Sequence, residues 1–262
     1  MQLRLFLFLS IFIFSNLSFA TELRLASTTS TKATGLLDIL ILEFEKDYGY
    51  TVKTFSVGTG TALRMGRQGK VDVLLVHAPV AEQKLVNDGY GILRTPVMKN
   101  DFVVAGPESD PAKIHLSKDV KAAFRNIIDS KSSFISRADD SGTHKKELAI
   151  WNAINTMPYG DWYYELGSGM SATLSAANKQ SAYVLVDRGT WLAKRKSLNI
   201  ILHVEADPLL DNPYHVIAVN PEKNDHINYA AAQAFIKWIT GKKGKEIINH
   251  LRVDNELLFK AY

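Results

Sequence analysis

Three short segments rich in small hydroxyl residues and glycine stand where a predicted strand passes into a predicted helix. They are Ser-Thr-Thr-Ser-Thr at 27–31, Gly-Thr-Gly-Thr at 58–61 and Ser-Gly-Thr at 141–143. The N-terminus of a helix presents unpaired backbone N–H groups and a partial positive charge, and a neighbouring Ser or Thr adds a hydroxyl donor. Each segment is therefore a candidate cradle for an anion. If the three converge, they form a dehydrated oxyanion site, which is the chemistry of a binding protein more than of a catalyst.

The elements that must position these segments follow from the apolar pattern of the chain. Residues 22–26 alternate like a strand, residues 33–48 carry apolar residues at helical spacing, and 71–76 contains the short apolar run typical of a buried parallel strand. Strands and helices continue to alternate towards the C-terminus. The pattern predicts an α/β fold with mainly parallel sheets.

The chain has neither an internal repeat nor a low-complexity linker, so we predict two lobes that share crossing strands. Residues 21–102 and 216–262 would form lobe I, and residues 103–215 would form lobe II. Extended crossings near 101–106 and 214–219 would join the lobes. Ligands of open α/β sheets bind beyond the carboxyl ends of strands, so we expect a ligand cleft between the lobes.

Composition and the first residues restrict the class of protein. Residues 1–20 have the pattern of a secretory signal, with Arg4 before an apolar run and a predicted cleavage after Ala20. The chain has no cysteine, which excludes disulfides, thiolate metal sites and a lipid-modified cysteine anchor. Its net charge is +4 with scattered Lys and Arg, which argues against a nucleic-acid partner. We expect an exported monomer without a lipid anchor, metal or cofactor.

Longer strings around the three segments are more specific than the segments themselves. They lie, in chain order, at 27–31, 35–38, 57–60, 72–77, 100–103, 136–147 and 187–190. The most specific is Ser-Arg-Ala-Asp-Asp-Ser-Gly-Thr-His-Lys-Lys-Glu at 136–147. Together these strings resemble the tungstate-binding periplasmic proteins of ABC importers, over nearly the whole chain after the signal.

The resemblance implies a type II periplasmic-binding-protein fold whose two lobes close on tungstate and deliver it to a membrane permease and ATPase. It also implies a periplasmic location. The resemblance points to ligand residues in the three hydroxyl segments and at Arg137, and a further predicted helix start adds Ser168. With neighbouring residues, the predicted set is Thr28, Thr29, Ser30, Thr59, Arg137, Ser141, Gly142, Thr143 and Ser168. Which hydroxyl of each motif contacts the anion stays open.

The chemistry of the anion separates the alternatives. Tungstate and molybdate are tetrahedral dianions without a proton at neutral pH, so their site needs only donors, which Ser, Thr, backbone N–H groups and Arg supply. Hydrogen phosphate keeps a proton and calls for an acceptor such as Asp139 or Asp140, so a phosphate receptor is the alternative.

An exported hydrolase using Asp139, Asp140 or His144 is a remote alternative, because the sequence holds no complete catalytic set. His77, after an apolar strand, is typical of a buried or cleft-edge histidine. We expect no enzymatic activity.

Overall fold

The computed structural model describes residues 22–262, and the predicted signal with its cleavage site lies outside these residues. The strands are β1 (Glu22–Thr28), β2 (Thr51–Val57), β3 (Val73–Val76), β4 (Gly91–Pro107), β5 (Phe134–Ser136), β6 (Tyr163–Glu165), β7 (Val184–Asp187), β8 (Ile200–Val204), β9 (Asp211–Val219), β10 (Arg252–Val253), β11 (Glu256–Leu257) and β12 (Lys260–Ala261). The α-helices are α1 (Thr29–Ala33), α2 (Leu36–Tyr48), α3 (Thr59–Arg67), α4 (Pro79–Asn87), α5 (Val120–Ser130), α6 (Gly142–Ala153), α7 (Met170–Gln180), α8 (Arg188–Lys194), α9 (Tyr229–Ile239) and α10 (Lys242–His250).

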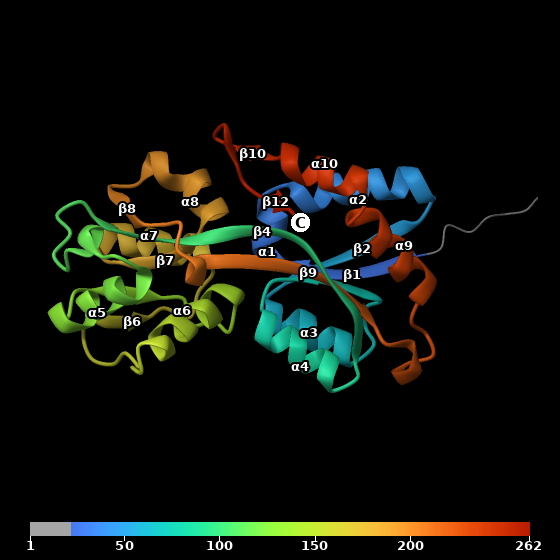
Figure 1. The fold of residues 1–262 in the computed structure, drawn as a ribbon, viewed down its shortest axis with the longest axis horizontal. Helices are drawn as coiled ribbons and strands as arrows, with labels where there is room; N and C mark the ends of the chain where they lie inside the picture. The colour runs from blue at the N-terminus through green and yellow to red at the C-terminus, as the bar shows by residue number, and fades with distance from the viewer. Residues whose placement is uncertain (1–21) are drawn as a thin grey trace, which may run out of the picture.

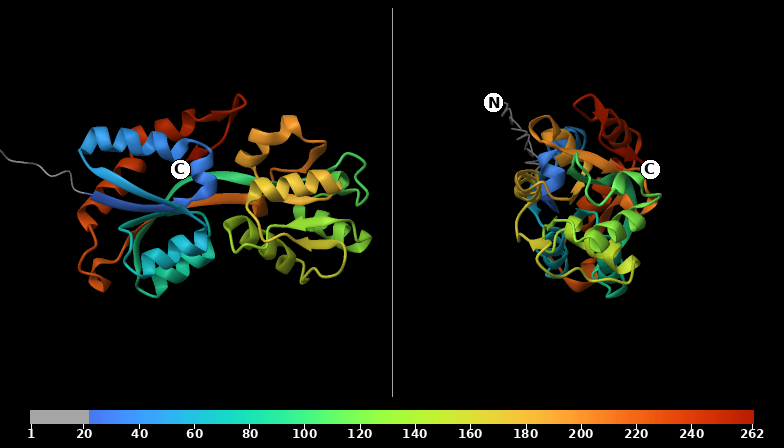
Figure 2. Two further views of the ribbon diagram at one scale, coloured as in Figure 1. Left: turned by 180° about the vertical axis from the view of Figure 1, so that it is seen from behind. Right: turned by 90° about the vertical axis from the view of Figure 1, so that its left-hand side faces the viewer.

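The elements gather in two groups, which Figure 1 shows side by side and Figure 2 shows from behind and end on. The first lobe contains β1 to β3 with α1 to α4, α9 and α10, and the second lobe contains β5 to β8 with α5 to α8. The long strands β4 and β9 pair antiparallel and run from one lobe to the other. The predicted lobe boundaries, at residues 102 and 215, fall inside these two strands. The exact residues at which one lobe ends and the other begins stay a prediction.

The main sheet is mixed, which corrects the expectation of mainly parallel sheets. Its strand order is β12-β4-β9-β3-β1-β2, and only β1, β2 and β3 run parallel within it. The chain leaves the first lobe on β4 and returns on β9, so the pairs formed by these strands are antiparallel. Helices cover both faces of the sheet, and a buried strand is then apolar on both sides whatever its direction. The sequence pattern therefore could not distinguish the two arrangements.

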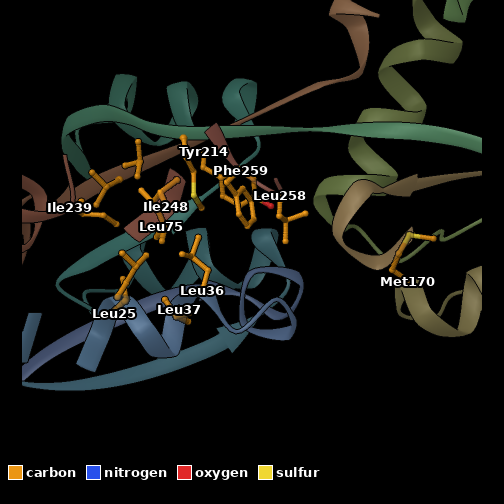
Figure 3. Packing of buried hydrophobic residues seen from close by; sticks show 14 of the residues in the cluster. Leu25, Leu36, Leu37, Leu75, Met170, Tyr214, Ile239, Ile248, Leu258 and Phe259 are labelled. Carbon is orange, nitrogen blue, oxygen red and sulfur yellow. The ribbon is translucent and has the colours of Figure 1, made fainter. Parts of the chain in front are cut away.

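The apolar residues of the parallel strands alternate between two helical layers. Leu25 and Leu75 pack in one cluster with Leu36 and Leu37 of α2, and the same cluster extends to Met170 of α7 in the second lobe (Figure 3). On the opposite face, α3 and α4 cover the strands in a second cluster that includes Leu74 and Val76. Packing on both faces fixes the three strands, whose carboxyl ends then meet at one edge of the sheet, next to the second lobe.

Candidate anion-binding site

The segments that follow β1, β2, β3 and β5 enclose one small cavity between the lobes. It is lined by Thr28, Thr29, Ser30, Gly58, Thr59, His77, Arg137, Ser141, Gly142 and Thr143. The space open to the centre of a water molecule is about 20 Å³. A single water needs about 10–15 Å³ by the same measure, so the cavity suits one compact ion and is too small for an organic ligand.

Larger hollows lie elsewhere on the surface. One beside α5, with a volume of about 610 Å³, is lined by residues that include Ile128, Tyr159 and Trp162. It contains none of the ligand residues predicted from the sequence. The small cavity, by contrast, brings together polar groups of both lobes, and it is therefore the candidate site.

The first wall of the cavity is the turn from β1 into α1. Thr28 ends the strand and caps the helix, since its Oγ1 accepts a hydrogen bond from the Thr31 N–H at 3.2 Å. The same oxygen lies 3.0 Å from Ser30 Oγ. Ser27 is turned into the sheet, where its hydroxyl donates to the Leu75 carbonyl oxygen at 3.0 Å. Ser27 thus belongs to the fold, and the residues after it face the cavity.

The second wall is the start of α3. Gly58 is the N-cap and offers no side chain, and Thr59 is the first helical residue. Thr59 is only 1% exposed, and its Oγ1 has no hydrogen-bond partner among the described residues. A buried hydroxyl without a partner costs about 1–3 kcal/mol. The first N–H groups of α3 have no partner within the helix either, so this wall presents unused donors to the cavity.

The third wall comes from the second lobe, where Arg137 follows β5 and Ser141 caps α6. Ser141 Oγ accepts a hydrogen bond from the His144 N–H at 3.2 Å. The Arg137 guanidinium is buried, forms an ion pair with Asp139 and donates to Thr143 Oγ1 at 3.4 Å. Its Nε has no partner within residues 22–262. Arg137, which lines the cavity, thus has one charged donor without a partner among these residues.

Behind Arg137, a buried carboxylate holds the second lobe together. Glu147 of α6 is 1% exposed and accepts hydrogen bonds from Ser136 Oγ at 2.9 Å, Trp151 Nε1 at 3.2 Å and Tyr163 OH at 2.6 Å. Burial raises the pKa of Glu147 to about 7, and the three donors oppose that rise. The contacts tie β5, β6 and α6 to one another, so the start of α6 and the residue after Ser136 keep fixed positions.

His77, which follows β3, completes the cavity and was not among the predicted ligand residues. Its Nδ1 lies 2.8 Å from Asn212 Oδ1, and its ring stacks on Tyr214 with centroids 4.5 Å apart. Burial lowers the pKa of His77, although the Asn212 contact opposes this. The backbone of Gly142 lies against the ring, and an added Cβ there would be 2.6 Å from His77 Cε1. Only glycine lets α6 begin this close to the first lobe.

The remaining predicted residue, Ser168, is not part of the cavity lining. Its N–H donates to the Arg137 carbonyl oxygen at 3.2 Å, so it contacts the backbone of a lining residue instead. The sequence pattern predicted a helix start here, and α7 does begin at Met170. A helix start alone does not say which way its donors point.

The acidic residues considered as acceptors also lie outside the lining. Asp139 is occupied by Arg137 and by the Ser141 N–H at 3.2 Å, and Asp140 is exposed and paired with Lys145. His144 Nδ1 accepts from the Asp140 N–H at 3.2 Å, and this nitrogen is not paired with the Ser141 hydroxyl. Among the described residues the cavity is therefore lined by hydroxyls, backbone, one imidazole and one guanidinium, without a carboxylate.

The fold and this cavity define a class of protein. A family model described as the PBP superfamily domain matches residues 19–243, so the chain is a member of the PBP superfamily of binding proteins. The tungstate-binding protein TupA of Peptoclostridium acidaminophilum is 48% identical over 86% of this chain and 79% of that protein. This similarity places the chain in the TupA family of tungstate-binding proteins.

Two solved structures agree with this assignment. The tungstate ABC transporter structure from Geobacter sulfurreducens is 42% identical with a TM-score of 0.78, covering 87% of this chain and 97% of that chain. TupA from Desulfovibrio alaskensis G20 is 38% identical with a TM-score of 0.83, covering 93% and 99%. The predicted α/β binding-protein fold and family are thereby confirmed, as is a binding protein in place of an enzyme. Between residues 22 and 262, no helix has the length and apolar character needed to cross a membrane.

Proposed function

We propose that this chain is the substrate-binding component of an ABC importer and binds tungstate in the cavity between its lobes. The observation that carries the proposal is a pair of buried donors, Thr59 Oγ1 and Arg137 Nε, which lack partners within the described residues. They come from different lobes and belong to residues that line the same cavity. A tetrahedral oxyanion offers acceptors in several directions and would satisfy both. The names of the relatives support tungstate as the particular anion.

The donor set favours an anion that carries no proton. Hydrogen phosphate presents an O–H that needs an acceptor, and neither Asp139 nor Asp140 lines the cavity. Tungstate at neutral pH presents only acceptors, which match hydroxyls, backbone N–H groups and a guanidinium. Molybdate has the same charge and shape, so we expect it to bind the same groups. Any preference between the two would arise from small differences in size.

Binding would act on the arrangement of the lobes. An anion held by groups of both lobes binds the closed form better than the open form, and so shifts the population towards closure. The membrane permease would recognise the closed form. We further propose that residues 1–20 are removed on export and that the protein acts free in the periplasm, since the chain has no cysteine for a lipid anchor.

The test is a set of calorimetric titrations of the protein, freed of bound anion, with tungstate, molybdate, sulfate and phosphate. We expect tight binding of tungstate and molybdate and weak binding of sulfate and phosphate. Preference for phosphate would refute the donor-only site, and failure to bind any of the four would refute the proposed function.

Substitution of one lining residue locates the site in the same assay. Arg137→Gln should weaken tungstate binding at least about tenfold, because a hydrogen bond to a charged group contributes roughly 1.5–3 kcal/mol. Arg125→Gln removes an equal charge from an exposed position on α5 and serves as the control, with affinity expected to stay unchanged. Equal affinities of the two variants would show that the cavity is not the binding site.

A further inference from the structure

His77 is held in a hydrogen-bond chain that determines which of its nitrogens carries a proton. Asn212 Nδ2 donates to Asn100 Oδ1 at 2.7 Å, so the amide oxygen of Asn212 faces His77 Nδ1 at 2.8 Å. An amide oxygen only accepts, and therefore Nδ1 is the donor. In a neutral imidazole, Nε2 then carries a lone pair. Within residues 22–262, Nε2 has no hydrogen-bond partner, and its ring lines the cavity.

The charged groups that act on His77 each already have an ion-pair or hydrogen-bond partner. Arg137 is balanced by its ion pair with Asp139. Glu82 of α4 is buried and paired with Arg94, whose Nη2 also lies 3.1 Å from Nδ1 of His215 on β9, the strand neighbouring β3. Asp187 caps α8 and accepts hydrogen bonds from the Thr190 N–H and hydroxyl.

These charges and burial act on His77 in opposite directions. Burial is the main cause that lowers the pKa of His77, and the positive charge of Arg137 adds to it. The contact with Asn212 and the charges of Asp187 and Glu82 oppose that effect. The other ring against His77, that of Tyr214, is neutral because burial raises the pKa of its hydroxyl. His77 is therefore neutral at neutral pH with the lobes arranged as in this structure.

A dianion changes this balance. It brings two negative charges into a cavity whose one positive side chain is already paired, and charge interactions are stronger away from water. The lone pair of a neutral His77 Nε2 would also face the anion oxygens. Protonation at Nε2 removes both difficulties, since it supplies a positive charge and turns the lone pair into a donor.

We propose that His77 takes up one proton from solvent when the oxyanion binds, so that the anion is held by an imidazolium and a guanidinium together. The inference rests on the proposed function, because it requires an oxyanion in the cavity. Arg137 comes from the second lobe and His77 from the first, so each lobe would contribute one charged donor.

Calorimetry in several buffers tests the proton uptake directly. Tungstate is titrated into the protein at pH 7.5 in buffers with different ionisation enthalpies, such as PIPES, HEPES and Tris, and the slope of the binding enthalpy against the buffer enthalpy counts the protons taken up. For the wild type we expect about one proton per anion, with affinity falling about tenfold for each pH unit above neutrality. His77→Gln should bind more weakly, without proton uptake or this pH dependence. His144→Gln is the matched control, because His144 lies near the cavity but outside its lining, and it should keep the wild-type proton count.

The outcomes separate this inference from the proposed function. Tight tungstate binding by the wild type with no proton uptake would overturn the role of His77 and leave the proposed function intact. Uptake that persists in His77→Gln would assign the proton to another group and overturn it equally. Absence of binding to the wild type would instead refute the proposed function. Should His77→Gln fail to fold, the nitrogen-15 shifts of the wild-type His77 ring with and without tungstate decide, since Nε2 must change from a bare to a protonated nitrogen.

Discussion

Replacing Thr59 by Val should make the empty protein more stable and the anion complex weaker. The two side chains have nearly the same shape, and Val lacks only the hydroxyl oxygen. With the lobes arranged as in this structure, that oxygen is buried without a partner among the described residues. Its removal should therefore recover part of a desolvation cost of about 1–3 kcal/mol. For a chain of this size, each kcal/mol raises the melting temperature by about 2–4 °C.

The effect on binding has the opposite sign. A hydrogen bond between the Thr59 hydroxyl and a charged anion contributes about 1.5–3 kcal/mol, so Thr59→Val should lose roughly tenfold to a hundredfold in affinity for tungstate. The measurements are thermal unfolding of the protein freed of anion, and calorimetric titration with tungstate. Opposite signs in the two assays cannot result from simple damage to the fold.

A matched control lies two residues further along the same helix. The Thr61 hydroxyl accepts a hydrogen bond from Arg64 at 2.8 Å and is outside the cavity lining. Thr61→Val should leave tungstate affinity within about twofold of the wild type and should not raise the melting temperature. If Thr59→Val destabilises the empty protein, or binds tungstate as well as Thr61→Val does, the reasoning from the buried hydroxyl is wrong.

Two further predictions test how the second lobe positions the site. Gly142→Ala places a Cβ 2.6 Å from His77 Cε1, so it should obstruct closure of the lobes. Tungstate binding measured by calorimetry should weaken at least about tenfold. Gly169→Ala is the control, because its added Cβ meets nothing within 4 Å, and it should have no effect on binding. Burial raises the pKa of Glu147 from 4.5 to about 7, so the folded state binds the proton more tightly and stability falls as pH rises through this range, by roughly 3 kcal/mol. Glu147→Gln, measured by urea unfolding between pH 4.5 and 8, should lack this decline; an unchanged decline would contradict the assignment to Glu147.

The hydroxyl segments could be predicted from the sequence because their signal is local. Ser, Thr and Gly beside an apolar run indicate a helix start, and Thr28, Thr59 and Ser141 all lie at such starts. The family resemblance added Arg137. Ser168 has the same local pattern, but its N–H contacts the Arg137 backbone and it does not line the cavity. Local pattern therefore predicts donors well and predicts their convergence less well.

His77 needed information that is not local. Its partner Asn212 is 135 residues away, and the two meet only because β9 runs antiparallel beside β3. The direction of β9 was itself not predictable, since a strand buried on both faces is apolar in either direction. Strand β6 was missed for another reason: Tyr163–Glu165 is partly exposed and pairs on one side with β5, so it lacks the apolar run of a buried strand. Elements of two residues, such as β12, have no sequence period at all.

The two partnerless donors also bear on why closure would depend on the anion. Thr59 Oγ1 belongs to the first lobe and Arg137 Nε to the second, so separating the lobes would expose both to water. Closure without a ligand leaves both donors unsatisfied, whereas closure around an oxyanion gives each an acceptor. Two bonds to a charged ligand contribute together about 3–6 kcal/mol. Reversing a population from 1:99 to 99:1 requires about 5.5 kcal/mol of differential affinity. The two donors alone are thus of the right magnitude to shift the lobes towards closure when the anion binds.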